Sequence, residues 1–176
     1  INSKMFFGNE SLNAVLETAR RENHLNFCFM VSGTRGDDGR VHSAWNHLEA
    51  FLKLIFEQLK IPPKQVRIQA ILDGRDCHGE SSINAIDGVG DYLNRLQELL
   101  AKHCAVECLA WVIGRNFAMD RNYHEENIRK DYLLLTKGVG QEVNGFDGVR
   151  SAISKSHSTG VEDSNIPGMV VRHAEP

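Results

Sequence analysis

The sequence has few cysteines, no long apolar run and no excess of basic charge. Its 176 residues contain four cysteines and no CxxC pair, which excludes a disulfide-stapled scaffold and favours a reducing, cytoplasmic compartment. The longest apolar stretch, residues 25–31, is far shorter than the roughly 20 residues of a membrane-spanning helix. With 20 Lys+Arg against 23 Asp+Glu, the net charge of −3 argues against a general nucleic-acid binder. We therefore expect neither a membrane nor a nucleic acid as a partner.

The sequence also lacks a convincing metal-binding motif. His103, Cys104 and Cys108 lie close together, but no second pair of ligands follows them at the spacing of a zinc site. We interpret these cysteines as core or surface thiols, and we expect this chain to hold no metal ion.

Length and composition fit one globular domain. Hydrophobic residues make up 41% of the chain and charged residues 24%, which is the range of folded proteins. A chain of 176 residues is long enough to bury one hydrophobic core. It starts at Ile1 without an initiator Met and stops at Pro176 without a clear terminal element. We expect residues 1–176 to be a single domain cut from a longer protein.

The spacing of apolar residues predicts strands alternating with helices. Short, mostly apolar strands are predicted at residues 25–31, 66–72, 106–113 and 169–171. Spacing along one helical face predicts helices that begin near residue 9 or 11 and that cover residues 45–59, 83–100, 123–136 and, more weakly, 148–154. This order predicts an α/β fold, a three-layer α/β/α sandwich whose sheet is mainly parallel, with a mixed sheet as the alternative.

The loops that follow the first three strands carry the polar residues of interest. In sheets of this kind, ligands bind beyond the carboxyl ends of the strands, so these loops should share one edge. The second and third loops each place an arginine directly after a glycine, as Gly74-Arg75 and Gly114-Arg115. Glycine lets the backbone turn and approach a ligand, and arginine offers a planar fork for carboxylate or phosphate.

Arg75, Arg115 and Arg121, together with His42 from the first loop, would form a positive pocket on a net acidic protein. Asp76 would sit beside the bound anion, where a carboxylate must accept hydrogen bonds from hydroxyls or act as an acid and base. A small hydroxy acid bearing a phosphate would use all of these groups. The plainer interpretation is that each Arg–Asp pair is a loop-stapling ion pair and that His42 is a neighbour of a helix cap.

At these loops the sequence resembles the cofactor-independent (2,3-bisphosphoglycerate-independent) phosphoglycerate mutases, specifically their inserted substrate-binding, or transferase, domain. The resemblance runs from about Phe6 to Val171, and residues 39–43 (GRVHS), 72–76 (LDGRD) and 114–121 (GRNFAMDR) carry it. The sequence departs from the family pattern in the first loop and at Asn116, where members of the family commonly have a tyrosine.

The resemblance implies that five residues contact the substrate: His42, Arg75, Asp76, Arg115 and Arg121. In this interpretation Arg115 and Arg121 clamp the carboxylate, and Arg75 bridges to a hydroxyl or the phosphate. Asp76 is the catalytic acid and base at the hydroxyls, and His42 is a hydrogen-bonding partner of the phosphoryl or hydroxyl oxygens.

The implied parent enzyme is an isomerase of glycolysis and gluconeogenesis that interconverts 3-phosphoglycerate and 2-phosphoglycerate through a phosphoserine. The family's other domain, which resembles alkaline phosphatases, supplies the serine and two divalent metal ions (manganese or magnesium), and we expect it to be absent from this chain. The resemblance therefore implies a fragment that binds no cofactor itself, is inactive alone, and has as partners the two phosphoglycerates and the missing domain.

Two other functions stay open from the residues alone. One is a different sugar-phosphate or nucleotide enzyme on a doubly wound sheet, although the glycine fingerprint for phosphate is missing. The other is a non-catalytic module that binds small anions or a partner. Binding of 3-phosphoglycerate, with and without the missing domain, distinguishes the three.

Overall fold

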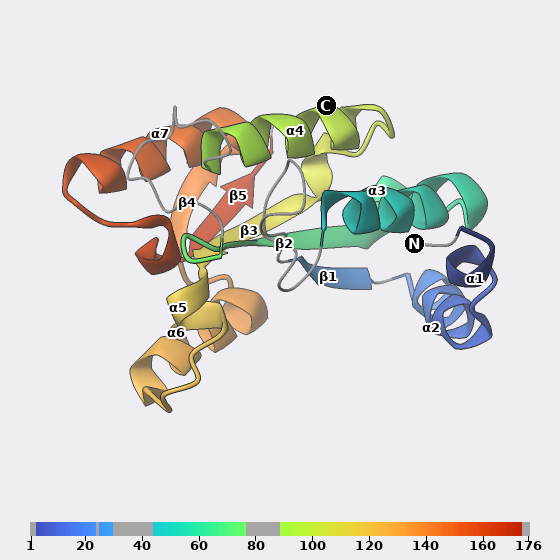
Figure 1. The fold of residues 1–176 in the computed structure, drawn as a ribbon, viewed down its shortest axis with the longest axis horizontal. Helices are drawn as coiled ribbons and strands as arrows, with labels where there is room; N and C mark the ends of the chain where they lie inside the picture. The colour runs from blue at the N-terminus through green and yellow to red at the C-terminus, as the bar shows by residue number, and fades with distance from the viewer. Residues whose placement is uncertain (1–2, 24, 30–43, 77–88, 174–176) are drawn as a thin grey trace.

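The computed structural model describes residues 3–23, 25–29, 44–76 and 89–173. Within them the chain forms a five-stranded sheet (Figure 1) of β1 (Leu25–Phe29), β2 (Val66–Leu72), β3 (Leu109–Gly114), β4 (Gln141–Asn144) and β5 (Met169–Arg172). The strand order is β1-β2-β3-β5-β4. β1, β2 and β3 are parallel, β5 is antiparallel to β3, and β4 is parallel to β5. The sheet is thus mixed but mainly parallel, and the predicted α/β class is confirmed.

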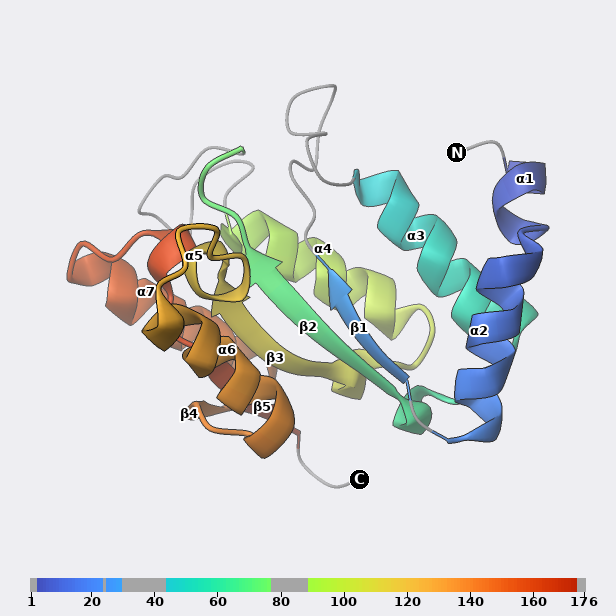
Figure 2. The ribbon, with the colours of Figure 1, turned by 90° about the horizontal axis from the view of Figure 1, so that it is seen from below.

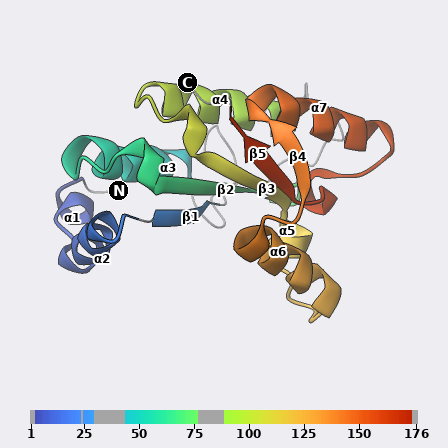
Figure 3. The same cartoon turned by 180° about the vertical axis from the view of Figure 1, so that it is seen from behind.

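Helices cover both faces of this sheet. They are α1 (Ser3–Phe7), α2 (Glu10–Arg21), α3 (Trp45–Lys53), α4 (Val89–Ala101), α5 (Arg115–Ala118), α6 (Glu125–Lys137) and α7 (Gly145–Ser158). Figures 1 and 3 show α3, α4 and α7 on one face and α5 and α6 on the other, with α1 and α2 beside β1. The three-layer arrangement follows from strands that are apolar on both sides and must be covered twice.

The helix ends show ordinary capping interactions. The Asn9 side chain accepts a hydrogen bond of 2.8 Å from the backbone N–H of Leu12 and so caps the start of α2. Gly138 ends α6 in the left-handed conformation, with φ of 62°. α3 continues as a π-helical turn, Leu54–Gln58, and the chain leaves the helical path at Lys60, whose φ is 54°, before it reaches Pro62 and the 3-10 turn that begins at Pro63.

Several elements differ from their predicted extent. Residues 106–108 form a 3-10 turn, so β3 begins at Leu109, and α7 is longer than residues 148–154. The predicted loop after β3 begins with the short helix α5. β4 has no counterpart among the predicted strands, because only Val143 of its four residues is buried and such an edge strand carries little apolar signal. The predicted helical residues 83–88 lie outside the described part of the chain.

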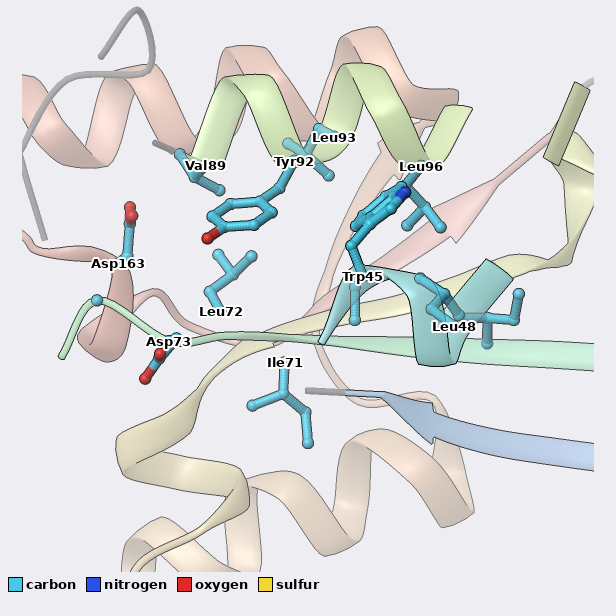
Figure 4. A pocket seen from close by; sticks show the side chains of 13 residues that line it. Trp45, Leu48, Ile71, Leu72, Asp73, Val89, Tyr92, Leu93, Leu96 and Asp163 are labelled. Carbon is cyan, nitrogen blue, oxygen red and sulfur yellow. The ribbon is translucent and has the colours of Figure 1, made fainter. Parts of the chain in front are cut away.

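The main core lies between the sheet and the α3–α4–α7 layer. Trp45, Leu48 and Leu52 of α3 are buried in this core. Figure 4 shows Trp45 and Leu48 facing Tyr92, Leu93 and Leu96 of α4 above β2, around a small apolar cavity of about 60 Å³. A second, smaller cluster of Ile113, Leu134 and Val170 fixes α6 to the opposite face. Among the described helices, none has the length and apolar character needed to cross a membrane.

Candidate anion-binding site

The carboxyl ends of β2 and β3 lie side by side at one edge of the sheet. The two strands are parallel, and their register pairs Leu72 with Gly114. Arg75 follows β2 by three residues, and Arg115 follows β3 directly. Figure 2 shows the ends of these two strands, with α5 beside them. The sheet register therefore brings together the two Gly-Arg pairs that the sequence separates by 40 positions.

Gly74 and Gly114, which precede the two arginines, have no side chain, and this lets another segment of the same chain pack against them. A short 3-10 turn, Asp163–Asn165, lies against them from the far end of the chain. A Cβ atom added at Gly114 would lie 2.4 Å from the carbonyl oxygen of Ser164, and one added at Gly74 would lie 2.8 Å from the Ser164 nitrogen. Gly74 also adopts a φ of +62°, which favours glycine. The Gly-Arg pattern predicts that these glycines let a ligand approach, whereas in the structure it is the 163–165 turn that approaches them closely.

Arg115 forms an ion-pair network with two carboxylates of the neighbouring loop. Its Nη1 contacts Oδ1 of Asp73 and lies 2.7 Å from Oδ2 of Asp76. The Asp73 side chain is 1% exposed and the Arg115 side chain 12%, so solvent screens this pair weakly. Burial alone would lower the pKa of Arg115, but its hydrogen bonds to Asp76 and Asp73 raise it above the ordinary value. The guanidinium is therefore permanently charged and held in a fixed orientation.

The Asp120 carboxylate organises the loop that carries Arg121. Its Oδ1 accepts hydrogen bonds from the backbone N–H groups of Asn122 at 2.8 Å and His124 at 3.1 Å. Its Oδ2 accepts from Asn127 Nδ2 at 3.0 Å and lies 2.7 Å from Nδ1 of His124. Although burial would raise the pKa of Asp120, the hydrogen bonds from His124, Asn127 and the backbone together hold it well below the ordinary value. Asp120 thus ties the Arg121 segment to the start of α6.

Replacing Asp120 by asparagine is expected to lower the melting temperature at neutral pH. Because the pKa of Asp120 is depressed in the folded state, its stabilisation is complete above the unfolded value of about 3.9 and is lost as the pH falls below it. The difference between wild type and Asp120→Asn should therefore shrink in thermal melts recorded from about pH 6 down to about pH 2. Asp147→Asn is the control, since the Asp147 side chain is 97% exposed. A gap that stays constant over this range would contradict the ionised role of Asp120.

All three predicted arginines line one cavity of about 520 Å³ on this edge. Its other lining residues are largely polar and include Asn116, Asn127, Ser164 and Asn165. Arg75 and Arg121 are exposed, whereas Arg115 is mostly buried at the back of the β3 end. Two strand-end loops and the turn at 163–165 therefore build a hollow lined by three guanidinium groups, two carboxylates (Asp120 and Glu162) and several hydrogen-bonding groups, which can hold a small anion.

The predicted site residues differ in where the structure places them. Arg75, Arg115 and Arg121 come together as expected. Asp76 is close by, with its side chain 27% exposed, and it contacts Arg115. His42 lies outside the described residues.

Sequence reasoning missed the contribution of the 163–165 turn. Asn116 Nδ2 donates to Asn165 Oδ1 at 2.8 Å and to Ser164 Oγ at 3.3 Å, which joins α5 to that turn. The 163–165 segment carries no motif and lies about 90 residues beyond the β2 loop, so no signal in the sequence pointed to it.

The thiols and the acidic groups do not suggest a metal centre. In the described ranges, no three His, Cys, Asp or Glu side chains gather as metal ligands would. Cys104 is exposed and Cys108 is buried, and both are free thiols. Burial, reinforced by Glu107, raises the pKa of Cys108 to about 12, and its Sγ lies 3.3 Å from the Pro63 carbonyl oxygen. Cys108 is therefore an inert core thiol, as the sequence predicts for it.

Comparison with known proteins identifies the family. The family model described as "BPG-independent PGAM N-terminus" matches residues 1–176, the whole chain. The chain belongs to this family. Relatives named 2,3-bisphosphoglycerate-independent phosphoglycerate mutase include proteins of Desulforudis audaxviator (31% identity over 173 residues, 97% of this chain) and Salinibacter ruber (31% over 175 residues, 98% of this chain). The chain spans about 30% of the length of these relatives.

The fold of this family member also matches a solved structure. A crystal structure of Leishmania mexicana phosphoglycerate mutase superposes with a TM-score of 0.68 at 22% sequence identity. The match covers 96% of this chain and 29% of that protein. The family resemblance predicted from the three loops is confirmed, and so is the fold class. The contacts assigned to individual residues stay predictions.

Proposed function

We propose that this chain is the glycerate- and phosphoglycerate-binding part of a 2,3-bisphosphoglycerate-independent phosphoglycerate mutase. Membership of the family supports the enzyme class. The observation that carries the proposal is the gathering of Arg75, Arg115 and Arg121 around one polar cavity at the ends of β2 and β3. A phosphoglycerate bears a carboxylate and a phosphate, and three guanidinium groups offer the charge and forked donors that both groups need.

Each side chain has a proposed part in holding the substrate. Arg115 and Arg121 clamp the carboxylate, and Arg75 reaches a hydroxyl or the phosphate. Asp73 supports this assignment because it orients the Arg115 guanidinium before any ligand arrives, which lowers the cost of binding. Asp76 is the proposed general acid and base, since its partly exposed carboxylate contacts Arg115, which lines the cavity. His42 is proposed to contact the phosphoryl or hydroxyl oxygens.

The remaining chemistry is proposed to belong to the part of the relatives' length that this chain does not span. That part would supply a serine nucleophile and two divalent metal ions, manganese or magnesium, which stabilise charge on the transferred phosphoryl group when bound. This chain would hold the freed glycerate while it re-orients, so that the second phosphoryl transfer remains effectively intramolecular. The fragment alone would bind substrate without turning it over.

The proposal is tested by titrating the chain with 3-phosphoglycerate in a calorimeter. We expect saturable binding that weakens at least about tenfold in Arg121→Ala, because a charge-assisted contact to the ligand is lost. Arg129→Ala is the matched control: it removes an exposed arginine on α6 that does not line the cavity. Absence of binding, or equal loss in both variants, would refute the proposed function.

The role of Asp76 is tested by kinetics in the full-length enzyme. Asp76→Asn keeps the shape of the side chain but cannot exchange a proton, so turnover should fall on the order of 100-fold. The KM for 3-phosphoglycerate should change much less. Near-normal turnover would refute the acid and base role and leave Asp76 as a structural partner of Arg115.

A further inference from the structure

The turn at residues 163–165 is the common support of the two arginine loops. It packs backbone to backbone against Gly74 and Gly114, and the N–H of Gly114 donates to the carbonyl oxygen of Ile166 at 2.8 Å. Asn116 of α5 binds the same turn through its side chain. A shift of this turn would therefore move Arg75 and Arg115 together.

A buried His–Asp pair fixes that turn to α7. Nε2 of His157, near the end of α7, is hydrogen-bonded to Oδ1 of Asp163 at 2.6 Å, and the two side chains are 4% and 6% exposed. Nδ1 of His157 is also buried and has no hydrogen-bond partner in the described part of the chain. A buried polar atom without a partner costs stability, and in the described part of the chain the bond to Asp163 is the hydrogen bond of the His157 side chain that offsets this cost.

The Asp163 carboxylate points away from the cavity that the three arginines line. Figure 4 shows the carboxylates of Asp73 and Asp163 pointing to opposite sides of the β2 end, and Asp73 is the one that contacts Arg115. Asp163 borders the apolar cavity beneath α4, and it is not among the residues that line the arginine cavity. Two routes therefore connect Asp163 to the site: the backbone of the turn, and the charge interaction between Asp163 and Asp73.

We propose that His157 and Asp163 are positioning residues of the site, which hold the 163–165 turn so that Arg75 and Arg115 are aligned for the anion. The proposal rests on the proposed function for its ligand, and it deepens that function by naming what aligns the binding groups. The pair lies on the opposite side of the sheet end from the ion pair of Arg115, and neither residue is expected to touch substrate.

The test combines hydrogen–deuterium exchange of the ligand-free chain with titration by 3-phosphoglycerate. His157→Phe keeps a ring of similar size but removes the donor, and His157→Gln can still donate to Asp163 from its amide. In His157→Phe we expect the Gly114 amide and residues 73–76 to exchange at least about tenfold faster, and the dissociation constant to rise at least about tenfold. His157→Gln should restore both toward wild type. Asp163→Ala should have the same effects, and the double variant should add little to either single change.

The control is Leu100→Ala, which removes a fully buried side chain at the end of α4. It should lower the melting temperature without a selective change at Gly114 or in binding. Unchanged exchange at Gly114 in folded His157→Phe or Asp163→Ala would overturn the proposal, as would a failure of His157→Gln to restore it. If wild type does not bind 3-phosphoglycerate while the exchange pattern is as expected, the proposed function fails and the positioning of the two loops stands.

Discussion

Replacing Arg115 by alanine is expected to destabilise the fold by on the order of 3 kcal/mol and to abolish phosphoglycerate binding. The first effect arises because Asp73 is 1% exposed, so its carboxylate would lose the cation that it contacts inside the protein. The second arises because Arg115 is the proposed carboxylate ligand at the end of β3. Urea unfolding measures the first effect, and calorimetric titration with 3-phosphoglycerate measures the second.

Arg75→Ala separates the two effects of the Arg115 change. Arg75 is exposed and lines the same cavity, so its loss should weaken binding while the free energy of unfolding stays within about 0.5 kcal/mol of wild type. Arg115→Lys should recover part of the stability but less of the binding, since an ammonium group lacks the planar fork. An Arg115→Ala protein as stable as wild type would show that the ion pair with Asp73 is not the structural support described above.

Gly114→Ala is expected to cost about 3 kcal/mol, although the backbone of Gly114 is unstrained. With φ of −71° this position accepts any residue, but the added Cβ would lie 2.4 Å from the Ser164 carbonyl oxygen and 2.6 Å from its carbonyl carbon. Both are backbone atoms of the 163–165 turn, so the turn must move. The melting temperature and the affinity for 3-phosphoglycerate should fall together.

Gly138→Ala is the matched control for that change. Gly138 has a φ of +62° and nothing within 4 Å of an added Cβ, so it tests backbone strain without any clash. We expect a cost of about 1 kcal/mol and unchanged binding. A smaller loss of stability at Gly114 than at Gly138 would contradict the close packing of the turn against β3.

The parts of the fold that the sequence predicts correctly are those with a strong local signal. The run at residues 66–72 is bounded by a turn on each side and is β2 as predicted. The predicted helix start near residue 9 and the predicted helix end near residue 136 are likewise set locally, by the side-chain hydrogen bond of Asn9 and the left-handed conformation of Gly138. β4 escapes prediction because pairing with β5, and not its own polar sequence, makes it a strand. Residues 115–118 escape for a similar reason, because α5 packs on the 163–165 turn and on α6.

Part of the candidate site could likewise be predicted from the sequence, and part could not. Arg75, Arg115 and Arg121 could be grouped from the sequence because parallel strands place their carboxyl-end loops at one edge. The partners of these arginines could not be predicted. Asp73, Asn116 and the His157–Asp163 pair support the site through contacts within the folded chain, many of them between segments that are distant in the sequence. The prediction for Gly74 and Gly114 was right that the backbone is approached closely there, but the approaching group is a turn from the end of the chain, which the sequence does not show.

A crystal structure of this chain with bound 3-phosphoglycerate tests the central claim most directly. The account predicts that the carboxylate and phosphate oxygens lie within about 3 Å of guanidinium nitrogens of Arg75, Arg115 and Arg121, with a hydroxyl next to Asp76. A ligand seated elsewhere on the molecule, with these three arginines left uncontacted, would contradict it.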